Sequence, residues 1–284
     1  MSDIPNLVDA FTPAEVATKV KTIGVYKATM PLLSLVVLSL MAGAFIAFGA
    51  MYYTVVITDS QAAAYGVIKL LGGIAFSLGF IMVVIAGAEL FTGNTLVVMA
   101  WAKKHISLGD LLKNWSIVYL CNTLGALAMV YLVYLSGFLG NHHHQVGATA
   151  IQLGVAKVNH SMLEAFVLGI FCNVLVCLAS WMAYASRTVT DKILAIIFPI
   201  SAFVAMGFEH SIANLYMIPV AMLAAADPAA VTQSGLSADQ LANLDFSGLI
   251  SNLIPVTLGN IVGGALFVAM TYYLVYVYSA KSAD

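Results

Sequence analysis

Two glutamates and a histidine interrupt long apolar stretches of this sequence, at Glu89, Glu209 and His210. Ionisable side chains are costly in apolar surroundings, so such residues usually face a water-filled path or one another. A histidine titrates near neutral pH and can give a hydrogen bond or a proton to a weak-acid anion. Each glutamate either caps backbone amides that a broken helix leaves free or meets a permeating solute. The chemistry on offer is therefore the handling of a small polar solute.

Further candidate residues surround this trio. Thr92 lies about one helical turn after Glu89 and supplies a hydroxyl group. Asn173 either lines the same path or forms a hydrogen bond between helices. Lys157 either draws anions toward an outer vestibule or extends its ammonium group to the membrane surface. Four apolar side chains near these positions either narrow the path or pack in the interior: Phe76, Leu90, Phe91 and Phe203.

The composition identifies the class of protein that must position these residues. Of the 284 residues, 62% are hydrophobic and only 8% are charged, and the mean hydropathy is +0.98. A soluble domain carries roughly 25% charged residues. This predicts an all-helical integral membrane protein and excludes a soluble enzyme, a nucleic-acid binder and a disordered chain.

No resident cofactor or metal is expected. The three cysteines lie in apolar runs and form neither a disulfide framework nor a metal-ligand pair. The consecutive histidines at 142–144 have no nearby acid or cysteine to complete a metal site. We therefore expect a membrane protein that is not an enzyme and whose transport runs on solute gradients.

Six stretches are long and apolar enough to span a membrane, which requires about 20 residues each. The second and fifth are too long for single straight helices, and both carry a glycine and a glutamate near the middle, so we predict that both are broken. All lysines and arginines except Lys69 and Lys157 fall on one side, which the positive-inside rule makes cytoplasmic, together with both termini. The six stretches are 32–57, 70–102, 114–139, 161–185, 193–226 and 246–279.

The first 28 residues precede the six-span pore domain of 29–284. Thr12-Pro13-Ala14-Glu15 is a capping-box start for a helix. Apolar residues then recur at helical spacing, which predicts a short amphipathic helix on the inner membrane surface. This helix either anchors the chain passively or gates the pore from the cytoplasmic side.

The two halves of the chain carry matching motifs. Because each half would contain three spans, the halves must insert in opposite orientations, and the two broken helices meet near the membrane midplane. The N-termini of the restarting half-helices would then face one passage with partial positive charge, which suits an anion. The matching pairs are Gly87-x-Glu89-x4-Asn94 with Gly207-x-Glu209-x4-Asn214, Asn114-x7-Asn122-x2-Gly125 with Asn252-x7-Asn260-x2-Gly263, and, weakly, Gly43-x-Phe45 with Gly169-x-Phe171.

Four segments resemble signatures of the formate/nitrite transporter family, most closely those of its formate channels from the bacterial inner membrane. They are residues 86–93 (AGAELFTG), 169–179 (GIFCNVLVCLA), 207–214 (GFEHSIAN) and 254–260 (IPVTLGN). The resemblance covers essentially the whole chain. It implies a homopentamer embedded in lipid, with an aquaporin-like protomer fold and one pore in each protomer.

The resemblance also implies the substrate and the residues that handle it. Members pass formate, and relatives pass nitrite and other small monovalent anions. The family's central histidine falls on His210, its loop threonine on Thr92, and its outer lysine and asparagine on Lys157 and Asn173. We therefore expect a channel in which helix ends attract the anion and His210 assists its passage.

Three alternatives stay open. The protein could be a nitrite or other weak-acid anion/proton symporter of the same family. It could be an aquaporin-type pore for neutral solutes, although such pores need an arginine filter and the sole arginine, Arg187, lies at the inner boundary. A membrane-embedded enzyme is disfavoured because no metal or nucleophile constellation is present.

Overall fold

The computed structural model describes residues 9–60 and 63–279, and in that part of the chain every regular element is helical. Five helices are long and apolar enough to cross a membrane, so this is a multi-pass membrane protein. A sixth span results if the pair Ser211–Ala224 and Pro228–Ser234, which meet at 110°, counts as one. The five are α2 (Leu32–Ile57), α3 (Tyr65–Met82) with its extension to Gly87, α6 (Leu108–Leu135), α8 (Met162–Ala185) and α13 (Phe246–Ile261) with its π-helical extension to Tyr278.

The helical backbone is interrupted at two places, one in each half of the chain. After α3, a π-helical turn ends at Gly87, whose φ is +84°, and residues 88–90 are extended before α4 (Phe91–Asn94) begins. A 3-10 turn and α5 (Val98–Ala102) follow. In the second half, α9 (Val189–Ala205) and α10 (Ser211–Ala224) are separated at Gly207, whose φ is +72°. Glycine adopts these positive φ values without the strain that a side chain would add.

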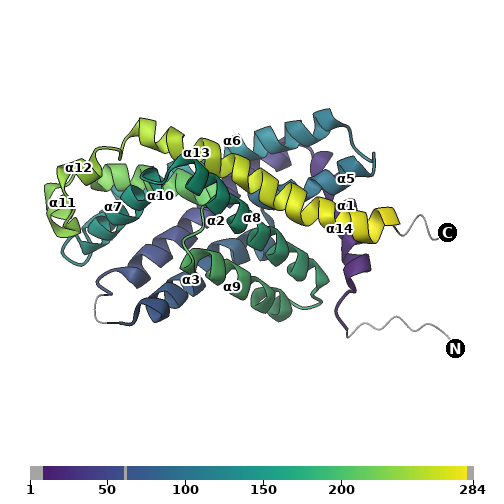
Figure 1. Cartoon of the computed structure of the whole chain (residues 1–284), viewed down its shortest axis with the longest axis horizontal. Coiled ribbons are helices and arrows are strands. Elements are labelled where there is room, and N and C mark those ends of the chain that lie inside the picture. The colour runs from purple at the N-terminus through teal and green to yellow at the C-terminus, as the bar shows by residue number, and fades with distance from the viewer. Residues whose placement is uncertain (1–8, 61–62, 280–284) are drawn as a thin grey trace.

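A helix that the sequence did not predict lies between α6 and α8. Residues 140–160 fall between the third and fourth predicted spans, yet α7 (Gln145–Val158) occupies most of this segment and most of its residues are buried. It follows three left-handed residues at 142–144. In Figure 1, α7 gathers with α11 (Pro228–Ser234) and α12 (Ala238–Leu241) at one end of the molecule, and α1 and α5 lie at the other.

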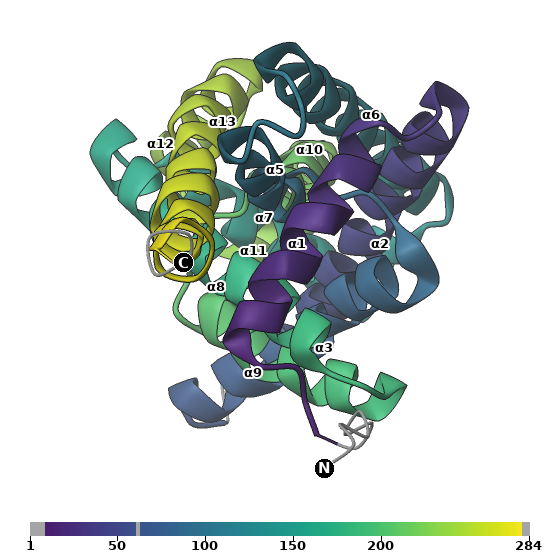
Figure 2. The same ribbon diagram turned by 90° about the vertical axis from the view of Figure 1, so that its right-hand side faces the viewer.

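The N-terminal helix α1 (Pro13–Ala28) begins with the predicted capping box: Glu15 N donates to Thr12 Oγ1, and Glu15 Oε2 accepts from Thr12 N. The expectation that its apolar face lies on the membrane surface is wrong. Val16 and Val20 are buried in a core cluster with α5 and α8, and Gly24 allows close approach to Ala100. Figure 2 shows α1 running across one face of the helix bundle.

Candidate functional site

A buried ion pair lies beside the interruption between α9 and α10. Glu209, only 2% exposed, follows Gly207, and its Oε1 accepts a hydrogen bond from Lys157 Nζ at 2.9 Å. Lys157 comes from the last turn of α7. Asn214 Nδ2 donates to Glu209 Oε2 at 2.6 Å and contacts Asn252 Oδ1 at 2.7 Å, while Asn252 Nδ2 donates to the carbonyl of Lys157 at 2.9 Å. The charge of the buried carboxylate is thus matched by an ammonium group and by amide donors.

A second cluster with the same connections lies beside the other interruption. Lys27 Nζ, near the end of α1, donates to Glu89 Oε1 at 2.7 Å and to Asn94 Oδ1 at 3.0 Å. Asn94 Nδ2 donates to Glu89 Oε2 at 2.8 Å. Asn114 Nδ2 donates to the carbonyl of Lys27 at 3.0 Å. Each cluster therefore combines a lysine, a glutamate and two asparagines.

Two further asparagines satisfy the backbone at the interruptions. Asn122 Nδ2 donates to the carbonyls of Ser39 and Glu89, and its Oδ1 accepts from Phe91 N. Asn260 makes the equivalent contacts in the second half, donating to the carbonyls of Gly169 and Glu209. Its Oδ1 accepts from the first amide of α10, at 2.9 Å. Where a helix is broken, the free backbone groups need such partners.

The interpretation of Glu89 and Glu209 as caps of free backbone amides is therefore wrong. Their carboxylate oxygens accept from lysine and asparagine side chains, and asparagines satisfy the first amides of α4 and α10. The physical reason is that an ammonium group compensates a buried negative charge better than neutral amides do. The glutamates bind the ends of α1 and α7 to the interruptions.

The correspondence between the first and fourth predicted spans is also corrected. The amides of Glu89 and Glu209 donate to the carbonyls of Leu38 and Leu168. Leu38 and Leu168 lie 130 positions apart in the sequence, whereas Gly43 and Gly169, the pair matched from the sequence, lie 126 positions apart. A shift of four residues is about one helical turn and keeps the same face of the helix inward, so the pattern alone did not distinguish the two registers.

His210 is the N-cap residue of α10. Its Nδ1 accepts from Ala213 N at 3.0 Å, so that nitrogen carries no proton in this structure. The ring proton is therefore on Nε2, which lies 2.9 Å from Thr92 Oγ1 and donates to it. The ring of Phe203 stacks on the imidazole at a centroid distance of 6.0 Å. His210 and Thr92, from opposite halves of the chain, thus form one buried hydrogen bond.

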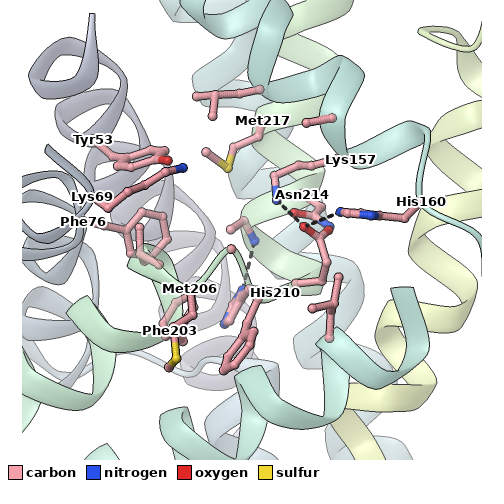
Figure 3. Close-up of a pocket in the computed structure, with 18 residues that line it drawn as sticks. Tyr53, Lys69, Phe76, Lys157, His160, Phe203, Met206, His210, Asn214 and Met217 are labelled. Atoms are coloured by element: carbon pink, nitrogen blue, oxygen red, sulfur yellow. Dashed lines mark hydrogen bonds and ion pairs between the residues drawn. The ribbon is translucent and has the colours of Figure 1, made fainter. Parts of the chain in front are cut away.

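A cavity of about 350 Å³ opens beside His210 and the Lys157 cluster. Figure 3 shows the lysine and the imidazole lying along its wall. Phe76 and Phe203 also line it, and their rings meet edge to face at 5.7 Å. A separate cavity of about 270 Å³ is lined by Lys27, Glu89 and Leu90. Each cluster therefore has its own cavity.

Three of the expected site residues line neither cavity: Thr92, which is hydrogen-bonded to His210, and Asn173 and Phe91. Asn173 Nδ2 donates to the carbonyls of Thr92 and Asn260, so this side chain connects the two interrupted segments. Phe91 packs edge to face against Trp115 and Tyr119. Asn173 thus fits the alternative of an interhelical hydrogen-bond partner, and Phe91 fits that of packing.

Sequence reasoning gave no site role to several residues of these cavities, among them Lys27 and His160. Lys27 was assigned to a surface helix, and His160 received no role, although its Nε2 lies 3.8 Å from Glu209 Oε1. A signal for Lys27 was present, because Lys27 and Lys157 stand 130 positions apart, as Leu38 and Leu168 do. Lys27 of α1 and Lys157 of α7 therefore occupy matching positions in the two halves of the chain.

Known proteins are similar to this chain in sequence and in fold. A family model described as "Formate/nitrite transporter" matches residues 14–274. The formate channel FocA of Escherichia coli K12 is 42% identical over 95% of this chain and 96% of its own length. The probable formate transporter of Methanothermobacter thermautotrophicus is 39% identical over 93% of this chain and 97% of its own. A solved structure, a pentameric formate channel with formate bound, superposes with a TM-score of 0.81 at 42% identity, covering 87% of this chain and 98% of that one.

Proposed function

Because this chain belongs to the formate/nitrite transporter family, we propose that it conducts formate, and similar small monovalent anions, across a membrane. The observation that carries the proposal is that His210, whose ring is hydrogen-bonded to Thr92, lines the same cavity as Lys157. The cavity supplies a cation, oriented donors and an apolar wall in one place. A small carboxylate requires all three to leave water and pass through an apolar bundle.

The anion first meets the cavity that contains Lys157. One proton of this ammonium group is directed to Glu209 Oε1, and an ammonium group has three. The remaining protons can hydrogen-bond a carboxylate without breaking the ion pair. The N-terminus of α10, which begins at Ser211, adds partial positive charge at the same wall.

His210 then acts as a hydrogen-bond donor. Its Nε2–H, which donates to Thr92 Oγ1, can exchange this acceptor for an oxygen of the anion. Transfer of that proton would leave an anionic ring unless Nδ1 first gained a proton, and Nδ1 accepts from Ala213 N. Donation of a hydrogen bond is therefore the role that the geometry favours for this ring.

The apolar walls of the two cavities limit which solutes can pass beyond His210. The edge-to-face pair of Phe76 and Phe203 narrows the first cavity, and Leu90 lines the second. Hydrophobic narrowings of this kind hinder hydrated ions, while a small anion held by fixed donors loses less on leaving water. Lys27, on the wall of the second cavity, receives the anion on the other side.

The same proposal covers the architecture. Helices α1 to α6 and α7 to α13 form two inverted repeats, supported by the matching contacts of Lys27–Glu89 and Lys157–Glu209. The interruptions at 88–90 and 206–210 break the second and fifth spans. Residues 1–284 form a single channel domain, in which residues 1–28 are cytoplasmic and precede the six-span pore. The distribution of lysines supports a cytoplasmic location for both termini.

The assembly and location follow from the relatives. A solved neighbour is described as pentameric, which supports a homopentamer with one pore in each protomer. The exposed apolar side chains of α2, α6 and α13 suit contact with lipid and with neighbouring protomers. The bacterial relatives support a location in the inner membrane.

Uptake of radiolabelled formate into proteoliposomes tests the proposal. We expect uptake well above that of empty liposomes, at pH values from about 5 to 8. Thr92→Val keeps the shape of the side chain but removes the hydroxyl, and we expect it to lower the rate by about tenfold, the equivalent of one hydrogen bond to a charged group. His143→Ala, at an exposed position, serves as the matched control. Wild-type protein that takes up formate no faster than empty liposomes would exclude the proposal.

A further inference from the structure

The cavity that holds Lys157 and His210 adjoins another cavity of about 380 Å³, which is lined by the end of α2, the start of α3 and the middle of α7. The two share Lys69 and Leu153 as lining residues. Polar side chains, Ser60, Thr149 and Gln152, line the adjoining cavity. A solute that comes through the adjoining cavity therefore passes Lys69 before it reaches Lys157.

The charges around the first cavity are unevenly matched. Lys157 is neutralised by Glu209 at 2.9 Å, and His160 also lies near that carboxylate, at 3.8 Å. Glu209 is the only acidic residue among the described residues that line the two cavities. Within residues 9–60 and 63–279, no carboxylate lies within ion-pair distance of Lys69. Its ammonium group instead lies 5.6 Å from the centroid of the Tyr65 ring.

A matched pair and an unmatched charge act over different distances. The fields of Lys157 and Glu209 largely cancel beyond a few ångströms, so this pair binds an anion only after the anion has arrived. An unmatched ammonium group acts over about one Debye length, roughly 10 Å at 0.1 M salt. Lys69 is half-buried between the two cavities, where low-dielectric walls concentrate its field. Figure 3 shows its side chain beside Tyr53, on the side of the cavity away from Lys157.

We propose that Lys69 is the residue that collects small anions at this mouth of the pore and raises their concentration beside Lys157. This inference rests on the proposed anion conduction and adds a residue to it. Lys69 supplies the net positive charge, and Lys157 supplies directed hydrogen bonds. Tyr65 holds the Lys69 ammonium group through its ring without neutralising it, as a carboxylate would.

The first test measures the local potential without any transport. Met206 lines the same cavity and is 54% exposed, so Met206→Cys places a reporter thiol there. The three native cysteines are buried, which keeps background labelling low. The readout is the ratio of labelling rates with an anionic and a cationic methanethiosulfonate reagent of similar size, in proteoliposomes at about 0.01 M ionic strength.

We expect Lys69→Gln to lower this ratio about three- to tenfold in the reporter protein, and Lys69→Arg to leave it within about twofold. The effect should shrink to less than about twofold near 1 M salt, where the Debye length is about 3 Å. Lys113→Gln, which removes a lysine that lines neither cavity, is the matched control and should leave the ratio unchanged. A ratio that Lys69→Gln leaves unchanged at low salt overturns the proposal.

The second test measures formate uptake at substrate concentrations well below saturation. At low ionic strength, Lys69→Gln should take up formate about three- to tenfold more slowly than the wild type. At high ionic strength its rate should be close to that of the wild type measured under the same conditions, and Lys69→Arg and Lys113→Gln should match the wild type throughout. An equal loss at every ionic strength, or a loss with Lys69→Arg as large as with Lys69→Gln, would show a structural role and overturn the proposal. If the wild-type protein does not transport formate but the reporter ratio responds as stated, the proposed function fails and the assignment of Lys69 stands.

Discussion

The two hydrogen bonds of His210 can be separated by choosing its replacement. Asparagine is a strongly preferred N-cap residue, and its Oδ1 can accept from Ala213 N as His210 Nδ1 does. Its shorter side chain cannot also reach Thr92 Oγ1, which His210 contacts at 2.9 Å. Alanine makes neither contact. His210→Asn therefore keeps the N-cap and His210→Ala loses it, while both variants lose the hydrogen bond to Thr92.

The structure gives a magnitude for each effect. Loss of a side-chain N-cap costs about 1 kcal/mol, so the alanine variant should be less stable than the asparagine variant by about that amount. For a chain of about 150–250 residues this corresponds to about 2–4 °C in Tm, and slightly less is expected for this longer chain. Both variants leave the Thr92 hydroxyl without its donor, and both should lower formate uptake by at least about tenfold, since a hydrogen bond to a charged group contributes about 1.5–3 kcal/mol.

The assay pairs thermal unfolding of the purified protein in detergent with formate uptake in proteoliposomes. His143→Ala, at an exposed position, controls for the removal of an imidazole. An alanine variant that melts at the same temperature as the asparagine variant would refute the capping role of Nδ1. An asparagine variant that transports at the wild-type rate would refute the pore role of Nε2, because only this second contact is lost in it.

Three further predictions concern stability, each measured by thermal unfolding. Gly125→Ala should destabilise the folded protein by about 1–3 kcal/mol, because the added Cβ would overlap a backbone carbonyl of α2. The matched control is Gly66→Ala, whose added Cβ would meet nothing within 4 Å, and it should be neutral or stabilising. Equal Tm values for the two variants would contradict the packing argument. Asn260→Asp should cost about 3 kcal/mol or more because a carboxylate would face the two carbonyls that the amide now satisfies, and a Tm within 1–2 °C of the wild type would exclude this role. The hydrogen bond from the Ala229 amide, and then the His144 contact at 2.6 Å, hold the pKa of Asp227 below its ordinary value of 3.8. Asp227→Ala should therefore lower Tm at neutral pH, and the difference in Tm from the wild type should disappear as the pH falls through that lowered pKa. A difference in Tm that grows on acidification would contradict this sign.

The class of the protein and its long helices could be predicted from hydropathy, because a membrane span requires a run of apolar residues that no other element requires. Helix α7 could not. It is short, many of its buried residues are small, such as Gly147, Ala148 and Gly154, and its apolar signal is weaker than that of a span. Its start after three left-handed histidine residues at 142–144 has no sequence signature either, since such residues usually do not adopt positive φ.

The residues of the candidate site were found more readily than their partners. The repeated glycine–glutamate–asparagine pattern pointed to Glu89 and Glu209 because charge inside an apolar run is rare. Their lysine partners lie 62 and 52 positions away, at the ends of α1 and α7. A lysine at the end of a helix has the same appearance whether it faces water or a buried carboxylate, so the pairing depended on knowing where α1 packs.

That pairing also constrains how the N-terminal helix can act. If α1 left the bundle as a gate, Glu89 would lose the ammonium group of Lys27, and an uncompensated buried charge costs about 3–5 kcal/mol. Burial of Val16 and Val20 adds to the resistance, because their apolar surface would be exposed to water. The matching position of α7 in the other half indicates that both short helices stabilise the interruptions. A gating motion at this end must therefore either keep Lys27 on Glu89 or neutralise Glu89 first.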